Sequence, residues 1–313
     1  MKIAVVMVTF NRIHDLKIAI SRYEQQTFAP NLVIVVNNAS TDGTKEYLED
    51  WEMKKGPFQK KVIHLESNIG GSGGFYTGLK YAFQTECDWY WIADDDAFLE
   101  YDGLSQLSIF LRKHKDINRK CVALAGSVVL DPEIMEYDLG HRRTISVKYG
   151  IPKQNMVSVD NYQKEYFEIG LFTFVGAFVR AKAAKKAGLP HGDFFIYFDD
   201  IEYSYRIGKL GTMYCVPSCK VFHNTGKHEE VYGSNWRSYY QSRNMLLFYK
   251  EHFPNAYRRK VAKRILQKIV LTPIGKYSSV NQMDWDAMVD ASKDKKGISE
   301  KYYIGWKNNQ FSK

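Results

Sequence analysis

The first hundred residues alternate between short apolar runs and segments with helical spacing, and this alternation constrains the fold more than any other feature. Apolar runs at 3–8 and 32–36 flank a segment, 11–26, whose apolar residues recur every three or four positions. Such runs are typical of strands buried on both faces, and the spacing between them is typical of a helix. We therefore expect a βαβ unit here. The expected elements continue as a helix over 44–51, a strand over 61–65, a helix over 75–85 and a strand over 89–93.

Polar or acidic residues directly follow three of the expected strands. These turns are Thr9–Arg12, Asn37–Asp42 and Asp94–Asp96. In open parallel sheets, ligands bind beyond the carboxyl ends of the strands. The three turns should therefore line one crevice.

The acidic turn points to a metal ion. Three adjacent carboxylates repel one another unless a cation or hydrogen-bond donors compensate them, and hard divalent cations prefer oxygen ligands. Asp94 and Asp96 could reach one ion, leaving Asp95 to orient them or to bind elsewhere. The alternative is a solvated acidic turn that caps a helix.

A glycine-rich stretch, Asn68–Gly74, precedes the helix expected from about Phe75. Glycine lets backbone N–H groups approach an anion closely, and a helix N-terminus favours phosphate. The pattern matches neither the dinucleotide-binding fingerprint nor the P-loop. A purely structural turn is the alternative.

A second acidic cluster, Asp199-Asp200-Ile201-Glu202, lies among aromatic residues in the second half of the chain. Apolar surroundings raise the proton affinity of a carboxylate, as a general base near neutral pH requires. The acidic first turn of an ordinary helix would give the same pattern. His223 follows an apolar run at 213–222 and could complete a metal site, with His228 as its competitor. A histidine that only makes hydrogen bonds is the alternative at this position.

The second half of the chain is less regular. We expect strands over 122–130 and 171–180, turns and short strands over 131–161, a helix over 181–187 and mainly helical structure from Trp236. No internal repeat or low-complexity linker is evident. The simplest division is a catalytic domain over 1–250 and a helical, basic appendage over 251–313.

Charge and cysteine content limit the partners and the compartment. The 44 Lys and Arg exceed the 35 Asp and Glu, and the formal net charge of +9 predicts attraction to a polyanion. Nucleic acid is disfavoured because the basic residues concentrate in the C-terminal half without a recognised binding module. The first apolar run is too short to cross a membrane, and no export signal accompanies it. The four cysteines fit reduced thiols with a structural role, so we expect a cytoplasmic protein.

The segment 258–269 suggests contact with a membrane surface. On a helical projection, its basic residues fall on one side and its apolar residues on the other, an arrangement typical of interfacial helices. Anionic lipid would attract this segment. The alternative is a helix packed on the catalytic domain through its apolar side, with its basic side in solvent.

Taken in order, these motifs resemble glycosyltransferase family 2, whose members have the GT-A fold, and the resemblance covers roughly residues 1–250. It implies an α/β fold in which helices flank a mixed sheet, with the helical appendage at the C-terminus. The glycine-rich stretch, Phe198–Glu202, His223 and Ser242-Arg243-Asn244 resemble bacterial galactofuranosyltransferases more than rhamnosyltransferases. Two departures are Asn37, where many relatives have Asp, and Gln241, where mycobacterial relatives have His.

The resemblance also implies residue roles. Asp94, Asp96 and His223 would bind Mn²⁺ or Mg²⁺, Asp200 would act as the base, and Glu202 would position the acceptor or the base. The remaining residues expected around the nucleotide-sugar donor are Thr9, Phe10, Asn11, Arg12, Asn37, Asn38, Asn68, Gly71, Ser72, Gly73, Gly74 and Asp95.

The expected reaction moves a sugar with inversion onto a hydroxyl group of a glycan or lipid-linked glycan in bacterial surface polysaccharide synthesis. The resemblance favours UDP-galactofuranose as the donor. The alternatives are a rhamnosyltransferase that uses dTDP-rhamnose and a nucleotide-sugar-binding protein without catalysis.

Overall fold

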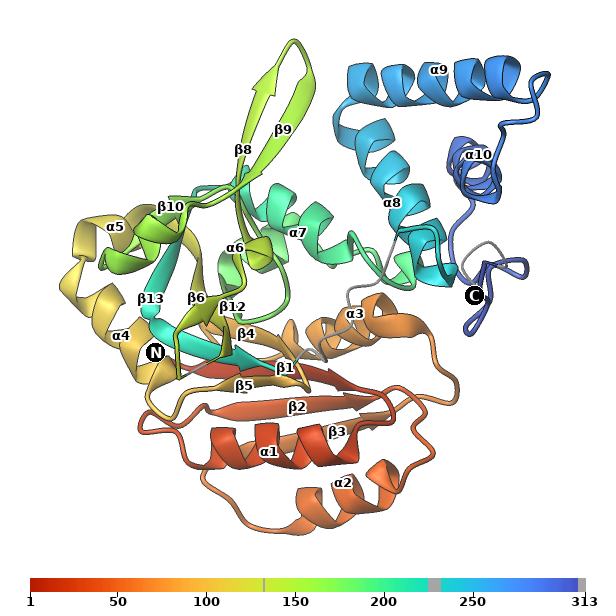
Figure 1. Ribbon diagram of the computed structural model, residues 1–313. Coiled ribbons are helices and arrows are strands. Elements are labelled where there is room, and N and C mark those ends of the chain that lie inside the picture. Colours follow the sequence, from red (N-terminus) through yellow and green to blue (C-terminus); the bar gives the residue numbers. More distant parts are fainter. Residues whose placement is uncertain (132, 225–231, 309–313) are drawn as a thin grey trace. The chain divides into compact units, whose positions relative to one another are not determined.

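The computed structural model describes residues 1–131, 133–224 and 232–308. The chain divides into two compact units (Figure 1). The first comprises Met1–Ile145, Gln154–Gly192 and Asp200–Gly226, and the second comprises Ser146–Lys153, Asp193–Asp199 and Lys227–Lys313. The longest segment of the second unit therefore starts before residue 250, which is the boundary that the sequence suggested.

The first unit begins with the alternation of strands and helices that the apolar runs predicted. The seven elements and their bounds are β1 (Ile3–Thr9), α1 (Ile13–Glu24), β2 (Leu32–Asn37), α2 (Thr44–Met53), β3 (Gln59–His64), α3 (Gly70–Ala82) and β4 (Trp89–Asp94). Their type and order confirm the expectation. The start of α3 differs from it by five residues.

The following elements are shorter and less regular. They are β5 (Ala97–Leu99), α4 (Gly103–Lys113), α5 (Lys115–Lys120), β6 (Cys121–Asp131), β7 (Glu136–Tyr137), η1 (Leu139–His141), β8 (Arg142–Lys148), β9 (Ile151–Met156), η2 (Val159–Gln163), β10 (Phe167–Ile169), β11 (Leu171–Phe172), β12 (Ala177–Arg180), α6 (Ala181–Ala187), η3 (Gly192–Phe194), α7 (Asp199–Gly208) and β13 (Thr212–His223). The single strand expected over 171–180 is thus two separate strands, β11 and β12.

A mixed sheet forms the centre of the first unit. Its strand order is β10-β13-β6-β12-β4-β1-β2-β3, with β5 beside β13 and β7 beside β6. Neighbouring strands among β4, β1, β2 and β3 are parallel, whereas β12 pairs antiparallel with both β4 and β6. A smaller sheet has the order β11-β8-β9. This architecture confirms the expected mixed α/β fold.

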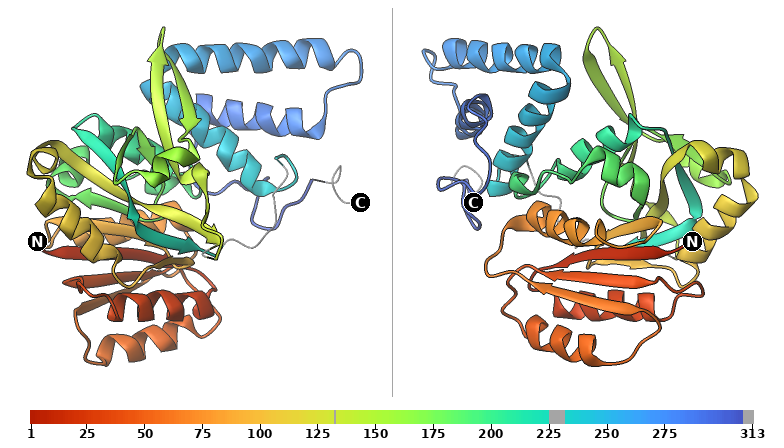
Figure 2. Two further views of the ribbon diagram at one scale, coloured as in Figure 1. Left: turned by 60° about the vertical axis from the view of Figure 1, so that its left-hand side comes forward. Right: turned by 180° about the vertical axis from the view of Figure 1, so that it is seen from behind.

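Helices cover both faces of the large sheet (Figures 1 and 2). Side chains of a strand alternate between its faces, so Val5 of β1 packs in one core cluster and Val6 in the other. The first cluster includes residues of α1, α2 and α4, and the second includes residues of α3, α6 and α7. Burial on both sides explains why the strands read as continuous apolar runs.

The second unit is mainly helical. It contains α8 (Trp236–His252), α9 (Pro254–Leu271) and α10 (Ser279–Ser292), and α9 packs against both of the others. The side chain of Asn235 caps α8, and Ser278 with Asn281 forms a capping box on α10. Within the described part of the chain, no helix has the length and apolar character needed to span a membrane.

Candidate functional site

The three polar turns lie at one edge of the sheet, as expected from their places after parallel strands. In the strand register, Thr9 is opposite Asn37, and Val8 is opposite Asp94. The ends of β1, β2 and β4 therefore bring the turns together (Figure 1). This edge is the candidate site.

The first turn presents side chains in three different ways. Thr9 is buried, and its Oγ1 has no hydrogen-bond partner among the described residues. Phe10 and the side chain of Arg12 are 39% and 49% exposed. Asn11 instead joins the first two turns, because its Oδ1 accepts from Thr41 N at 2.7 Å and its own N donates to Ser40 Oγ at 3.0 Å. Asn11 thus shapes this edge of the site.

The paired asparagines of the second turn are buried and already make hydrogen bonds. Asn37 Oδ1 accepts from Ser40 N at 3.0 Å, and Asn37 Nδ2 lies 3.1 Å from His64 Nδ1. Asn38 Nδ2 donates to Asn68 Oδ1 at 2.9 Å, and Asn38 Oδ1 accepts from Ile69 N at 3.0 Å. Asn38 and Asn68 therefore anchor the start of α3. His64 is the last residue of β3 and adds a side chain to this edge that the sequence pattern does not single out.

The glycine-rich stretch is not a loop, because α3 begins at Gly70. A Cβ on Gly74 would lie 2.5 Å from Val8 Cγ1, and one on Gly73 would lie 2.6 Å from Ile69 Cγ1. The absence of side chains thus allows α3 to pack closely against β1. Gly71 differs, since a Cβ there would meet no atom within 4 Å. Ser72 Oγ is buried without a hydrogen-bond partner among the described residues.

The acidic turn connects β4 to β5, and pairing of β5 with β13 brings His223 beside it. His223 is opposite Ala97 in this register, and its Nε2 lies 3.4 Å from Asp96 Oδ1. Ligand atoms of Asp94, Asp96 and His223 all lie within 4.8 Å of one another. The structure therefore brings together the three residues predicted to bind a metal. His228, the competing histidine, lies outside the described residues.

Arg12 supplies positive charge to the acidic turn. Its Nη1 lies 3.3 Å from Asp95 Oδ1 and also forms an ion pair with Asp96 Oδ2. Burial raises the pKa of Asp95 to about 7, and burial together with Asp96 raises the pKa of Asp94 well above its usual range. Burial alone would raise the pKa of Asp96 as well, but contact with His223 and Arg12 outweighs burial, and the pKa of Asp96 is lowered. The carboxylates are therefore only partly compensated by the chain's own cations.

Several buried atoms of this cluster lack hydrogen bonds within the described part of the chain. They are Asp95 Oδ2, Asp96 Oδ1 and His223 Nδ1. Buried polar atoms are seldom left unpaired, so each such atom calls for a ligand, ion or water. Oxygen ligands from aspartate with one imidazole nitrogen suit Mn²⁺ and also Mg²⁺, which usually retains several waters. These residues fit a divalent cation.

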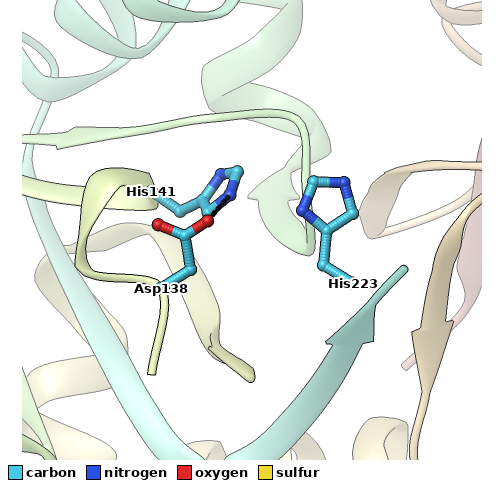
Figure 3. Close-up of side chains that lie close together, drawn as sticks. All are labelled: Asp138, His141 and His223. Carbon is cyan, nitrogen blue, oxygen red and sulfur yellow. Dashed lines mark hydrogen bonds and ion pairs between the residues drawn. The ribbon is translucent and has the colours of Figure 1, made fainter. Parts of the chain in front are cut away.

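A second group, Asp138 and His141, lies beside His223 and could not be recognised from the sequence pattern (Figure 3). Asp138 Oδ2 lies 3.1 Å from His141 Nε2, and His141 Nδ1 lies 2.6 Å from Thr173 Oγ1. The rings of His141 and His223 are 5.1 Å apart in an edge-to-face arrangement. Because both nitrogens of His141 have partners, its ring is held in a fixed position against that of His223. Asp138 and His141 fall in the segment expected to contain only turns and short strands.

Asp200 lies in the first turn of α7, consistent with the helix-start alternative, but its environment is not that of an exposed helix end. Its Oδ1 accepts from Ile201 N at 2.7 Å. Burial raises the pKa of Asp200 to about 6, although Arg143 and the backbone N–H of Phe174 act in the opposite direction. Thr173, the neighbour of Phe174, contacts His141 beside His223. A continuous set of contacts thus links Asp200 to the predicted metal ligands.

Glu202 has a different setting from Asp200. It is fully buried, and its two carboxylate oxygens accept from Arg206 Nε at 2.6 Å and Arg206 Nη2 at 2.7 Å. His191 Nε2 lies 3.8 Å from Glu202 Oε2. A bidentate pair of this kind holds both partners in fixed positions. Glu202 therefore stabilises α7 by fixing Arg206 one turn further along the helix.

The Ser242-Arg243-Asn244 motif lies in the second unit, where it holds the segment that leads to α7. Asn244 Nδ2 contacts the carbonyl oxygens of Phe194, Ile196 and Tyr197 at 2.8–2.9 Å. Arg243 Nη2 donates to Phe194 O at 3.1 Å. In this segment Phe195, Tyr197 and Phe198 have φ between 66° and 69°, which is costly for residues other than glycine. The motif thus stabilises a strained backbone directly before Asp199 and Asp200.

Solved structures with a similar fold contain a bound nucleotide or nucleotide sugar. S. aureus TarS 1–349 in complex with UDP aligns with a TM-score of 0.57 at 15% identity, covering 93% of this chain and 81% of that chain. GalNAc-T7 with UDP, GalNAc and Mn²⁺ gives 0.58 at 13% identity, covering 94% and 56%. A mannosyltransferase from Pyrobaculum calidifontis with GDP-Man and Mn²⁺ gives 0.56 at 15%, covering 94% and 88%. At these identities the likeness concerns the fold alone, and it confirms the expected GT-A architecture.

Sequence comparisons identify the family. Galactofuranosyltransferase GlfT1 of Mycolicibacterium smegmatis is 23% identical over 214 residues, which are 67% of this chain and 66% of that protein. GlfT1 of Mycobacterium tuberculosis is 25% identical over 208 residues, 66% of this chain and 64% of that protein. The chain thus spans slightly less than two thirds of the length of these relatives. The model of the family described as glycosyl transferase family 2 matches residues 4–188, more than half of the chain, so the protein belongs to glycosyltransferase family 2.

Proposed function

We propose that this protein transfers galactofuranose from UDP-galactofuranose to a hydroxyl group of a glycan or lipid-linked glycan, with inversion of the anomeric centre. The observation that carries the proposal is the arrangement of Asp94, Asp96 and His223 beside Arg12 at the carboxyl edge of the sheet. The similarity to two galactofuranosyltransferases supports the choice of donor. Bacterial surface polysaccharide synthesis in the cytoplasm, at the inner face of the plasma membrane, belongs to the same proposal.

Asp94, Asp96 and His223 would hold Mn²⁺ or Mg²⁺, which when bound would neutralise the diphosphate of the leaving nucleotide. Arg12 keeps two of the three carboxylates paired, and it remains half exposed toward solvent. The ring of His141, held by Asp138, packs edge-to-face against the ring of His223. Together, the proposed metal ligands and Arg12 would hold the diphosphate of the donor in one position.

Asp200 would act as the general base. A base must be ionised at the working pH and must still have enough proton affinity to accept a proton, and a pKa of about 6 meets both requirements near pH 7. Its carboxylate would take the proton of the acceptor hydroxyl as that oxygen attacks the anomeric carbon from the face opposite the nucleotide. A single displacement of this kind inverts the configuration.

A donor panel tests the proposal directly. UDP-galactofuranose, UDP-galactopyranose, UDP-glucose and dTDP-rhamnose would each be incubated with the protein, with and without Mn²⁺, and nucleotide release measured. We expect metal-dependent release from UDP-galactofuranose at a rate at least tenfold above the other donors. If dTDP-rhamnose were the only donor from which nucleotide is released, the rhamnosyltransferase alternative would be established. Binding of a donor without release, even with added glycan acceptors, would indicate a non-catalytic binding protein.

A further inference from the structure

Helix α9 packs against its neighbours through cations as well as through the apolar side chains of Tyr257 and Val261. Lys260 Nζ lies 5.2 Å from the centre of the Tyr249 ring, and Lys268 Nζ lies 3.8 Å from that of Trp285. Between them, Arg264 Nη2 donates to Ser242 Oγ at 2.8 Å and lies 3.4 Å from Asp284 Oδ1. Cations over aromatic rings and a cation paired with a carboxylate are favourable contacts. The stripe formed by Lys260, Arg264 and Lys268 is thus the inner side of α9.

Tyr257 and Val261 of α9 pack against a core cluster of the second unit, whereas four apolar side chains nearer the end of the helix are exposed. Among the residues of this helix, only Ala256 is buried. Ile265, Leu266, Ile269 and Val270 are 41%, 62%, 64% and 50% exposed, and Ile274, just beyond the helix, is 58% exposed. We call these five residues the outer apolar patch. Single exposed apolar residues are common, but a contiguous group on one helix marks an interaction surface.

The alternative in which α9 buries its apolar side and leaves its basic side in solvent agrees with this arrangement only in part, because Tyr257 and Val261 pack inward but the outer apolar patch is exposed. The expected separation into a basic and an apolar side is also only partly correct. Lys260, Arg264 and Lys268 form the inner stripe, whereas Arg258, Arg259 and Lys263 are exposed with the outer apolar patch.

The charge around the outer apolar patch identifies the kind of partner. Arg258, Arg259, Lys263 and Lys276 are all exposed, and no Asp or Glu occurs between His252 and Met283. A second copy of this chain would bring like charges together across the patch, which is unfavourable. Anionic lipid headgroups would instead neutralise the cations while the apolar side chains enter the boundary with the acyl chains.

We propose that the outer apolar patch of α9 and its flanking cations form a membrane-docking surface for bilayers that contain anionic lipids. The surface lies within the second unit and does not depend on the proposed sugar transfer. If both proposals hold, docking gives the enzyme access to an acceptor carried on a lipid.

Vesicle flotation of the full chain tests the surface. Wild type would be mixed with phosphatidylcholine vesicles, and with vesicles that also contain about 30% phosphatidylglycerol. We expect binding to the anionic vesicles only. The triple variant Ile265→Ser, Leu266→Ser, Ile269→Ser and the variant Arg258→Glu, Arg259→Glu, Lys263→Glu should each lose at least tenfold in partitioning. The matched control is Met53→Ser with Ile134→Ser, which removes two apolar side chains that are 80% and 72% exposed in the first unit and should bind like wild type.

A site-specific probe keeps the test valid if the triple variant folds poorly. In a Cys87→Ser background, an environment-sensitive fluorophore would be attached to Leu266→Cys or, as control, to Met53→Cys; the other three cysteines are buried. We expect a blue shift with anionic vesicles at position 266 and none at position 53. Equal behaviour of the two positions, or flotation of the triple variant like wild type, would overturn the proposal. Dimerisation of wild type that Leu266→Ser abolishes, without vesicle binding, would reassign the surface to a second copy. Nucleotide release from soluble donor should be unchanged in every variant, so failure of docking is distinguishable from failure of the proposed catalysis.

Discussion

At the scale of single residues, the candidate site combines groups that the sequence reveals with groups that it does not. Asp94 and Asp96 could be predicted because two acids directly after an apolar strand are visible locally, and His223 ends a strand in the same way. The pairing of Asp138 with His141 could not be predicted as part of the site. Its relevance depends on the contact with His223, which is more than eighty positions away in the chain. Asn244 likewise acquires its role from carbonyl groups that are 47 to 50 positions away.

Asp200→Asn should separate chemistry from binding. Because the amide cannot accept the proton, we expect kcat to fall by about 10²-fold or more, while donor affinity measured by calorimetry stays within about threefold of wild type. In wild type, kcat should decline as the pH falls below about 6, because Asp200 becomes protonated. Asp116→Asn, at an exposed carboxylate, is the control and should change neither value. An Asp200→Asn protein with wild-type turnover would exclude Asp200 as the base.

The same substitution should stabilise the protein at neutral pH. The folded-state pKa of Asp200 lies above the ordinary value of 3.8, so the folded protein holds this proton more tightly than the unfolded chain does. This contribution to stability is fully present below the ordinary pKa and is lost as the pH rises through about 6. Above that pH, Asp200→Asn should raise the free energy of unfolding by about 1–3 kcal/mol relative to wild type, measured by denaturant titration, and the gain should shrink at pH 4.

At the scale of elements, the sequence predicted the early strands and helices well because their periodicity is local. It predicted the start of α3 poorly, since a run of glycines favours a loop by its backbone freedom. These glycines lie in a helix instead, and at Gly74 the missing side chain is what lets this helix pack closely against β1. The inward-facing cations of α9 were missed for a related reason: periodicity gives the two sides of a helix, and only the partners Tyr249, Asp284 and Trp285 decide which side faces inward.

Substitutions in α3 can separate helix propensity from packing. Ala exceeds Gly in helix propensity by about 1 kcal/mol, and Gly71→Ala adds a Cβ in open space, so it should leave stability unchanged or raise it slightly. Gly74→Ala makes the same chemical change but places the Cβ against the stiff, buried side chain of Val8. Overpacking costs about 1–3 kcal/mol, so we expect Gly74→Ala to be less stable than Gly71→Ala in calorimetric unfolding. Equal stability of the two variants would show that α3 packs less closely on β1 than described.

At the scale of the whole molecule, charge is divided between the two proposed functions. The chain carries a formal net charge of +9, yet its sheet edge holds three adjacent carboxylates. Exposed cations gather instead around the outer apolar patch of α9. An acidic site cannot by itself attract a diphosphate, and it is Arg12 and a bound cation that would reverse its sign. The proposed docking surface and the proposed cation-dependent site are therefore compatible in one chain.

If a cation reverses the negative charge of this site, removing the cation and adding it back should change the thermal stability of the protein. A cation that binds only the folded site stabilises it by about 2.7 kcal/mol at a concentration one hundred times its Kd. For a unit of this size, that corresponds to about 5–10 °C in Tm. We expect Mn²⁺ to produce such a shift in chelator-treated wild type, measured by calorimetry. Asp96→Ala should abolish the shift and the metal-dependent binding of donor, because it removes one ligand and leaves Arg12 to pair with Asp95 alone. Asp116→Ala, which removes an exposed carboxylate outside the cluster, should keep the full shift. If Asp96→Ala and wild type respond equally to Mn²⁺, the ion binds elsewhere, and the role of Asp96 is to hold Arg12 together with Asp95 at the edge of the sheet.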